Sequence, residues 1–232
     1  RPDLAHRFTV KCVLYGGIAA RCSRARAVVS SVTGLGHVFT TNSLRNRLLR
    51  PLVSLTYKFV FGQSQIIFQN PDDRSDFLRL ALVDETRSHL IRGSGVDTGS
   101  FSPSTTARVE GPLTVLMVGR LLREKGVREF VDAAAIVRKR LPGVRFLLAG
   151  DSDPGNPSSI DTGMIAEWQR RGDVSFLGHR SDVRDLIRGA DLAVLPSYRE
   201  GAPRSLIEAA ACGLPIVATD VPGCREVVSH RI

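Results

Sequence analysis

The chain has 232 residues, 43% of them hydrophobic and 24% charged, a balance that is ordinary for a soluble globular protein with a sizeable core. No stretch approaches the roughly eighteen uncharged apolar residues of a membrane-spanning helix, which argues against a membrane-spanning protein. Residues 1–110 carry 15 Lys and Arg against 8 Asp and Glu, a net charge of +7, whereas residues 111–232 carry +2. The basic first half would attract phosphate groups on nucleic acids, anionic lipids or other phosphorylated ligands.

The first half alternates apolar runs with amphipathic stretches, which is typical of an α/β domain. Asn70-Pro71-Asp72 marks a change from strand to helix, because proline favours the first turn of a helix. We expect strands near 3–7, 27–32 and 64–69, and helices near 11–22, 43–61 and 71–82.

The segment 44–61 combines Arg45, Arg47, Arg50 and Lys58 with many apolar side chains. One interpretation is a helix that rests on an anionic membrane surface. The favoured interpretation is an ordinary helix with its apolar face in the core and its basic side chains in water.

Glycines and prolines then mark a flexible connection at about 93–112. The predicted organisation is an N-terminal domain over 1–96, a linker over 97–112 and a C-terminal domain over 113–232.

The second half shows nearly continuous apolar runs separated by helical patterns, as expected of parallel strands covered on both faces. This repeat predicts a Rossmann-like parallel sheet that binds ligands beyond the carboxyl ends of its strands. Ser181 is the expected cap of one helix. We expect strands at 113–118, 144–149, 174–177, 191–196 and 215–219, and helices at 126–140, 160–171, 181–190 and 203–212.

The motif GRLLREKG follows the first of these strands. We expect Gly119 to allow a sharp turn and a close approach of a ligand to the backbone. Arg120 offers a planar fork suited to phosphate, and Lys125 a point charge on a flexible stem. Each cation alone could equally be an ordinary surface residue.

The stretch EGAPRSLIEAAACG, residues 200–213, is more informative. Pro203 and Gly213 fit the two ends of a helix whose free amides would form an anion site near Gly201. Glu200 would repel a phosphate there unless cations lie nearby, and it could accept hydrogen bonds from sugar hydroxyls. Glu208 lies among apolar residues, where a ribose diol could satisfy it; a solvent-facing glutamate is the equally weighted alternative.

Cysteine and acidic residues give no metal signal. Cys12, Cys22, Cys212 and Cys224 show neither CxxC pairing nor a histidine at ligand spacing, which indicates reduced structural cysteines. Asp151 and Asp153 come nearest to a metal-binding Asp-x-Asp pair, but we place their loop away from the motifs above.

GRLLREKG, GHRSDV (178–183) and EGAPRSLIEAAACGLPIVATD together resemble the donor-binding half of retaining glycosyltransferases of the GT-B fold, family 4, whose E-x7-E signature Glu200 and Glu208 match. TGLG (33–36), FQNPDD (68–73) and LIRGSGVD (90–97) resemble bacterial enzymes that extend polyprenyl-diphosphate-linked or capsular saccharides. The likeness covers essentially the whole chain. It implies two Rossmann-like parallel-sheet domains facing a cleft, with the first domain incomplete and the C-terminal helices missing.

The resemblance assigns roles by position. Arg120 and Lys125 match the pair that binds the donor diphosphate and stabilises the leaving group. Glu200 matches the glutamate near the donor sugar, and Glu208 the one on the ribose. The same likeness places Gly119, Gly201, Ser205 and Leu206 around the phosphates, and His179 and Arg180 in the loop that reads the base.

On the acceptor side, His6 matches a histidine of the narrower group, where it could contact substrate. The favoured interpretation is a buried, hydrogen-bonded structural histidine. Thr33-Gly34 stands where many relatives have His-Gly, so no catalytic histidine is assigned there. The resemblance implies metal-independent, retaining transfer of a hexose or N-acetylhexosamine from a UDP-sugar, without a further cofactor. The acceptor would be a lipid-diphosphate-linked saccharide or a polysaccharide in bacterial cell-envelope synthesis.

Other functions remain open at this point. The chain could be a non-catalytic sugar-nucleotide-binding fragment, or a UDP-sugar epimerase of the same fold. Nucleic-acid binding is disfavoured, because aromatic residues make up only 6% of the chain and no recognised module is present. The expected location is the cytoplasm, with peripheral contact to the inner face of the membrane.

Overall fold

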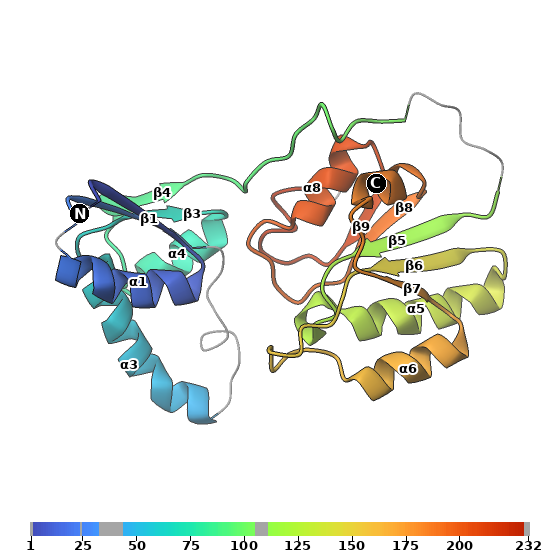
Figure 1. The fold of residues 1–232 in the computed structure, drawn as a ribbon, viewed down its shortest axis with the longest axis horizontal. Helices are drawn as coiled ribbons and strands as arrows, with labels where there is room; N and C mark the ends of the chain where they lie inside the picture. The colour runs from blue at the N-terminus through green and yellow to red at the C-terminus, as the bar shows by residue number, and fades with distance from the viewer. Residues whose placement is uncertain (1, 24, 33–43, 105–110, 230–232) are drawn as a thin grey trace. The chain divides into compact units, whose positions relative to one another are not determined.

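A computed structural model describes residues 2–23, 25–32, 44–104 and 111–229, without the side chains of residues 44–47. The chain forms two compact units, Arg1–Ser94 and Gly95–Ile232. Figure 1 shows a parallel sheet with helices in each unit. Each unit is an α/β layer structure, which confirms the predicted fold class.

The first unit contains a four-stranded parallel sheet of order β1-β2-β3-β4. Strand β4 was not predicted, because three residues are too few to show an apolar period. The strands are β1 (Leu4–Phe8), β2 (Ala27–Val32), β3 (Gln65–Phe68) and β4 (Ser88–Leu90), and the helices are α1 (Val10–Ser23), α3 (Leu44–Phe61), α4 (Pro71–Arg79) and the 3-10 turn η1 (Glu85–Arg87).

Helix α3 is apolar on two faces. One face enters the core through Tyr57, Val60 and Phe61, as the ordinary-helix interpretation requires. That interpretation is incomplete, however, because a second apolar stripe lies in solvent. The stripe consists of Leu48, Leu52, Leu55 and Phe59, whose exposed fractions lie between 49% and 81%. None of the described helices combines the length and apolar character that crossing a bilayer requires.

The second unit contains a five-stranded parallel sheet of order β7-β6-β5-β8-β9. The expected strands and helices are all present, with ends that differ by at most two residues. The strands are β5 (Thr114–Val118), β6 (Arg145–Ala149), β7 (Ser175–Gly178), β8 (Leu192–Leu195) and β9 (Ile216–Ala218), and the helices are η2 (Arg123–Lys125), α5 (Val127–Arg140), α6 (Thr162–Arg171), α7 (Val183–Arg188) and α8 (Arg204–Ala211). Asp182, not Ser181, precedes α7 as its cap residue.

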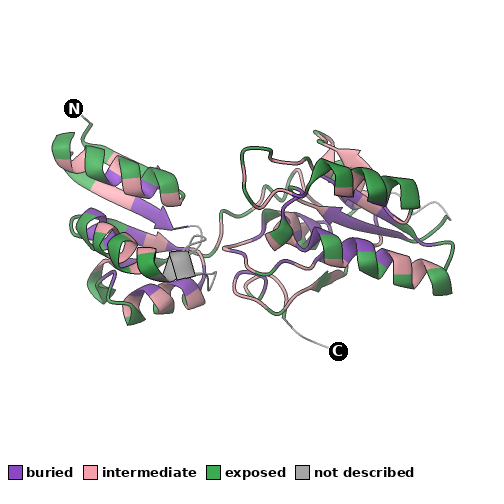
Figure 2. Cartoon of the chain, turned by 90° about the horizontal axis from the view of Figure 1, so that it is seen from below, coloured by how far each residue is buried: buried purple, intermediate pink, exposed green. Residues whose placement is uncertain are grey.

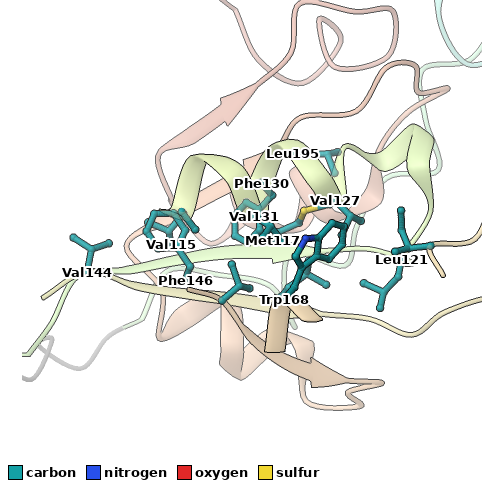
Figure 3. Packing of buried hydrophobic residues seen from close by; sticks show 14 of the residues in the cluster. Val115, Met117, Leu121, Val127, Phe130, Val131, Val144, Phe146, Trp168 and Leu195 are labelled. Atoms are coloured by element: carbon teal, nitrogen blue, oxygen red, sulfur yellow. The ribbon is translucent and has the colours of Figure 1, made fainter. Parts of the chain in front are cut away.

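Helices cover both faces of this sheet, and its central strands are the most buried, as the purple strand segments in Figure 2 show. On one face, Phe130 of α5 and Trp168 of α6 pack against Val115, Met117 and other strand residues (Figure 3). On the other, Ile187 of α7 and Ala209 of α8 pack against Leu116. The central strand β5 is apolar along its length because helices cover both of its faces, whereas Val217 on the edge strand β9 is 55% exposed.

The start of the expected linker 97–112 is anchored on the second unit. The Arg188 guanidinium donates to the Ser102 carbonyl at 3.0 Å and to the Ser102 hydroxyl at 2.9 Å. Phe101 packs against the α7–α8 side of the core. These contacts explain why the first described part of this segment belongs to the second compact unit.

Candidate functional site

The sheet order places the candidate site where the strand sequence reverses. Strands β5 and β8 are neighbours, and the chain leaves them toward opposite sides, β5 continuing to β6 and β8 to β9. Loops that leave the carboxyl ends of such a strand pair form the usual ligand crevice of an open α/β sheet. Here the loops are residues 119–126 after β5 and residues 196–203 after β8.

A glycine fixes the approach of these two loops. Gly126 ends η2 and precedes α5 with a φ of 72°. A Cβ built on it would lie 2.1 Å from the carbonyl oxygen of Pro196, so only glycine fits both the backbone angle and the space. The Tyr198 amide also donates to the Glu124 carbonyl at 2.9 Å. Lys125 is thereby held against the loop that follows β8.

Lys125 and Glu200 form a chelating ion pair. The Lys125 Nζ donates to the Glu200 Oε1 at 2.6 Å and Oε2 at 2.8 Å. The two side chains are only 22% and 8% exposed. The Ser197 hydroxyl, which is fully buried, donates to the same Oε1 at 2.7 Å. The Glu200 carboxylate is therefore held by three hydrogen bonds, close to the strand end.

The α8 helix begins at Arg204, with Pro203 as its N-terminal cap residue. The amide of Leu206 donates to the Pro203 carbonyl at 3.1 Å, and the Leu206 side chain is buried in the core. The Leu206 amide is therefore not among the free donors of the helix start. The amides of Arg204 and Ser205 have no hydrogen-bond partner within the described ranges, so they remain the available donors of the helix start.

Glu208 is buried on α8, with 8% of its surface exposed. Its Oε1 accepts a long hydrogen bond of 3.4 Å from the exposed Arg204 guanidinium, one helical turn earlier. Burial raises the pKa of Glu208, and the Arg204 charge opposes that rise only in part. The solvent-facing alternative is wrong. A buried carboxylate with one weak partner can accept further hydrogen bonds from a ligand.

Arg120 lies beyond the end of β5, where its Nη1 donates to the Asp153 Oδ2 at 2.8 Å. Placing the loop of Asp151 and Asp153 elsewhere was therefore wrong, since it borders the same cavity as Arg120. The loops meet because β5 and β6 are adjacent parallel strands and both leave the same edge. The two cations of the first motif thus sit in different ion pairs, Lys125 with Glu200 and Arg120 with Asp153.

Gly119 is the first residue after β5 and borders the same cavity. It does not have a positive φ, so it makes no left-handed turn. Space in front of it is open, because an added Cβ would meet no atom within 4 Å. Two backbone segments approach closely at Gly150, where an added Cβ would lie 1.9 Å from the Gly119 carbonyl oxygen. Gly119 therefore leaves open space beside the cavity.

This cavity has a volume of about 510 Å³ and brings together three loops that the sequence separates. The Arg180 side chain makes a two-point contact with Asp182, which holds the pKa of the Asp182 carboxyl below its usual range. Val118 borders both this cavity and the Ser205 end of α8. The polar and glycine residues lining the cavity are Gly119, Arg120, Gly150, Asp151, Ser152, Asp153, His179 and Arg180.

The acceptor-side residues are described only in part. His6 lies in β1 of the first unit, where its Nε2 is 2.9 Å from the Ser31 hydroxyl and its ring lies against Phe8. It is hydrogen-bonded but exposed, so the expectation of a buried histidine is wrong. Thr33 and Gly34 lie outside the described residues.

Two residues around the site escaped the sequence interpretation: Ser197, which donates to Glu200, and Thr219, whose hydroxyl donates to the Ser197 carbonyl. Ser197 lies two residues past the end of β8, and this position could have identified it as a candidate. Burial raises the pKa of the Cys224 thiol to about 11, and the Glu200 charge adds to this rise. Within the described residues, no three His, Cys, Asp or Glu side chains cluster as metal ligands would.

Comparison with known proteins gives a family match over this unit. The profile of the family described as "Glycosyl transferases group 1" matches residues 112–232. The chain is 32% identical to the N,N'-diacetylbacillosaminyl-diphospho-undecaprenol alpha-1,3-N-acetylgalactosaminyltransferase of Campylobacter jejuni, over 93% of this chain and 58% of that protein. It is 27% identical to the UDP-Gal:alpha-D-GlcNAc-diphosphoundecaprenol alpha-1,3-galactosyltransferase of Escherichia coli, over 99% of this chain and 60% of that protein.

Solved structures give the same fold. HepE of Anabaena, crystallised with UDP-glucose, superposes with a TM-score of 0.79 at 23% identity, over 98% of this chain and 62% of that one. Sucrose-phosphate synthase of Thermosynechococcus elongatus superposes with a TM-score of 0.76 at 24% identity, over 96% and 57%. The expected GT-B architecture is confirmed. The chain spans about three fifths of the length of the relatives it matches.

Proposed function

This chain belongs to the group 1 glycosyl transferases, and on that basis we propose that it moves a hexose or N-acetylhexosamine from a UDP-sugar to a saccharide acceptor. The observation that carries the proposal is the buried Lys125–Glu200 pair beside the start of α8. Such a pair combines a phosphate-binding cation with an acceptor for sugar hydroxyls. Relatives named as acting on undecaprenyl-diphosphate-linked sugars support a lipid-diphosphate-linked or polysaccharide acceptor in cell-surface glycan synthesis.

The donor diphosphate would bind between the two cations and the helix start. The Arg120–Asp153 pair is exposed, with 61% and 36% of the side chains in solvent, and such pairs contribute little stability. A diphosphate can therefore replace Asp153 as the partner of Arg120. Lys125 has three donors and uses two on Glu200, so one remains for the phosphate. Gly201 and the amides of Arg204 and Ser205 would complete the anion site.

The two glutamates would bind the sugars. A carboxylate offers about four acceptor positions, and Lys125 and Ser197 occupy three of them on Glu200. The remaining one suits a hydroxyl of the transferred sugar. Glu208, buried with one long hydrogen bond, suits the two hydroxyls of the uridine ribose. Both residues would have to be ionised to act as acceptors of all these bonds.

The cavity of about 510 Å³ is the proposed place of the uracil base. Gly119 leaves open space beside it, and His179 and Arg180 are among its lining residues. Because Arg180 is held by Asp182, we expect backbone groups of this loop rather than the guanidinium to recognise the base edge.

We propose that transfer retains the configuration of the sugar. The bond between C1 and the diphosphate oxygen breaks, a bond between C1 and the acceptor oxygen forms on the same face, and the departing phosphate takes the acceptor proton. Arg120, Lys125 and the α8 amides would stabilise the charge on the leaving diphosphate, which is the main catalytic effect in this scheme. Neither a metal ion nor a cofactor beyond the UDP-sugar is part of the proposal.

On the acceptor side, we assign His6, Thr33 and Gly34 as candidates for saccharide contact. An acceptor carried on a membrane lipid would place the protein at the cytoplasmic face of the membrane. The exposed stripe Leu48, Leu52, Leu55 and Phe59 on α3 supports a peripheral contact with anionic lipid. Failure to sediment with anionic vesicles at low salt would remove this contact from the proposal. Nucleic acid is not among the proposed partners.

Two measurements made together test the function. UDP calorimetry reports binding, and a radiolabelled UDP-sugar assay with lipid-linked acceptor reports transfer. Binding with transfer supports the proposal. Binding without transfer or hydrolysis would show this chain to be a sugar-nucleotide-binding fragment, and conversion of the donor without acceptor would show an epimerase. Absence of UDP binding would contradict all three functions.

A further inference from the structure

A second cationic site lies in the first unit. Arg7 in β1 is 93% buried, since only 7% of its surface is exposed. Its Nη2 donates to the hydroxyls of Ser30 and Ser64, both at 2.7 Å, and its Nη1 makes a weak bond of 3.3 Å to the Val13 carbonyl. These partners are all neutral. Burial without a counter-ion is costly for a guanidinium, and it lowers the pKa of Arg7.

Helix α1 accommodates this arginine at a cost to its own stability. Gly16 and Gly17 stand in the middle of the helix, where each glycine is about 1 kcal/mol less favourable than alanine. A Cβ at Gly17 would lie 2.4 Å from the Arg7 Nη1 and 2.1 Å from a Val60 methyl, and one at Gly16 would lie 3.2 Å from the Arg7 Cδ. The paired glycines therefore make the space in which the guanidinium lies.

Arg7 faces a cavity of about 330 Å³ whose lining comes from α1, the start of β2 and the end of α3. Arg21 borders the same cavity, with its guanidinium 4.2 Å from the centre of the Phe59 ring. The buried Nε atoms of Arg7 and Arg21 both lack a hydrogen-bond partner within the part of the chain that the structure describes. The lining residues include these two arginines and no Asp or Glu.

We propose that this cavity, which we call the Arg7 pocket, binds a phosphate-class oxyanion between the guanidinium groups of Arg7 and Arg21. A guanidinium carries five N–H donors, and Arg7 uses three of them on protein groups. A phosphate supplies the missing countercharge and takes donors in the fork geometry that arginine favours. A phosphate ion is much smaller than the cavity, so a phosphate group that is part of a larger molecule also fits.

The Arg7 pocket is independent of the proposed donor site, because all its residues belong to the first unit and the donor residues belong to the second. Two sources share the phosphate chemistry: free phosphate and the head group of an anionic lipid. The contact of Arg21 with Phe59, a member of the exposed stripe on α3, is the observation that makes a lipid head group worth testing.

The test titrates inorganic phosphate into the full chain by calorimetry without UDP, because the phosphates of UDP would also fit the Arg7 pocket. Parallel titrations in an Arg120→Ala/Lys125→Ala background remove any phosphate bound at the donor site. Wild type is expected to bind phosphate, and Arg7→Met and Arg21→Met each to weaken binding by at least about tenfold. The matched control Arg79→Met removes an exposed, Asp76-paired arginine on α4 and should leave binding unchanged. Arg21→Met decides the outcome if Arg7→Met does not fold.

Thermal unfolding distinguishes phosphate binding by Arg7 from a purely structural role of this arginine. Phosphate should raise the Tm of wild type but not that of Arg7→Met. A second arm compares sedimentation with phosphatidylcholine vesicles with and without phosphatidic acid. If Arg21→Met no longer sediments with the anionic vesicles and free phosphate competes with them, the ligand is a lipid head group. If the chain does not bind the vesicles, or binds them equally in all variants, the ligand is a free phosphate. Phosphate affinity that is undetectable in wild type, or equal in wild type and both variants, would overturn the proposal whatever the donor site does.

Discussion

The Lys125 Nζ lies 2.6 and 2.8 Å from the two carboxylate oxygens of Glu200, a residue 75 positions away in the chain. The strand order brings them together, because each lies in the loop after one of the two central strands β5 and β8. A pair this buried gains little net stability, since its desolvation offsets much of its attraction. Its place at a switch point beside a helix start is what makes it a candidate for ligand binding.

Replacing Lys125 with methionine should leave the Glu200 carboxylate buried with Ser197 as its main partner. We expect a loss of about 2 kcal/mol in the free energy of unfolding and at least a tenfold loss of UDP affinity, because a charged hydrogen bond to phosphate disappears as well. Urea unfolding and calorimetry measure the two effects. Lys139→Met, the same change on the exposed side of α5, should alter neither; equal effects from both variants would contradict a specific role.

Gly126→Ala tests the approach of the two loops. The new methyl would lie 2.1 Å from the Pro196 carbonyl oxygen at a φ of 72°, so the loop of Lys125 must move. We expect a loss of stability of more than about 2 kcal/mol and weaker UDP binding. Gly172→Ala is the matched control, since it has nearly the same φ of 71° and an added Cβ meets nothing within 4 Å. That variant should lose about 1 kcal/mol and keep UDP affinity.

Ser197→Ala removes one of the three hydrogen bonds that hold Glu200. We expect a loss of about 1 kcal/mol in stability, with sugar transfer reduced more strongly than UDP affinity, because Ser197 orients the sugar-binding carboxylate rather than the phosphate site. Transfer kinetics and UDP calorimetry on the same variant check this. A loss of UDP affinity as large as that in Lys125→Met would show that Ser197 acts on the phosphate site instead.

The variant Glu208→Gln tests two properties of Glu208: its raised pKa, through the pH dependence of stability, and its role in UDP binding, through UDP affinity. Burial raises the pKa of Glu208, so its contribution to stability is complete below the ordinary glutamate pKa of about 4.3 and is lost as the pH rises through the raised folded value. Compared with wild type, Glu208→Gln should therefore gain Tm as the pH rises from about 4 to about 7. Its UDP affinity should fall about tenfold at pH 7, because an amide is a weaker acceptor for the ribose hydroxyls. A constant Tm difference across this range would contradict the raised pKa.

The fold could be predicted in most of its parts from the sequence. Long apolar runs such as 114–118 identify buried parallel strands, and Pro71 after Asn70 identifies a helix start; the structure confirms both, with the Asn70 side chain accepting from the Asp73 amide at 2.8 Å. Strand β4 was not predicted, because three residues are too few to show an apolar period. The exposed stripe of α3 was missed because a helical pattern shows which residues are apolar but not which of two apolar faces the sheet covers.

The site was less predictable, for a physical reason. Sequence spacing placed Lys125 and Glu200 at strand ends, and strand adjacency then joined them. Asp153 could not be paired with Arg120 in the same way, because its loop after β6 has no regular structure to fix its direction. The tight packing between the loops after β5 and β6 depends on Gly150, which the sequence interpretation did not single out, because only the fold brings its Cα next to the Gly119 carbonyl.

The most direct test of the account is UDP calorimetry on the double variant Arg120→Ala/Lys125→Ala, beside Lys139→Ala/Arg140→Ala, which removes the same charges from the exposed end of α5. The account predicts that wild type and the α5 double variant bind UDP alike, and that the first double variant loses more than about a hundredfold in affinity, because two charged contacts to the diphosphate disappear. Unchanged UDP affinity in the variant lacking Arg120 and Lys125 would contradict the central claim that these two cations bind the diphosphate.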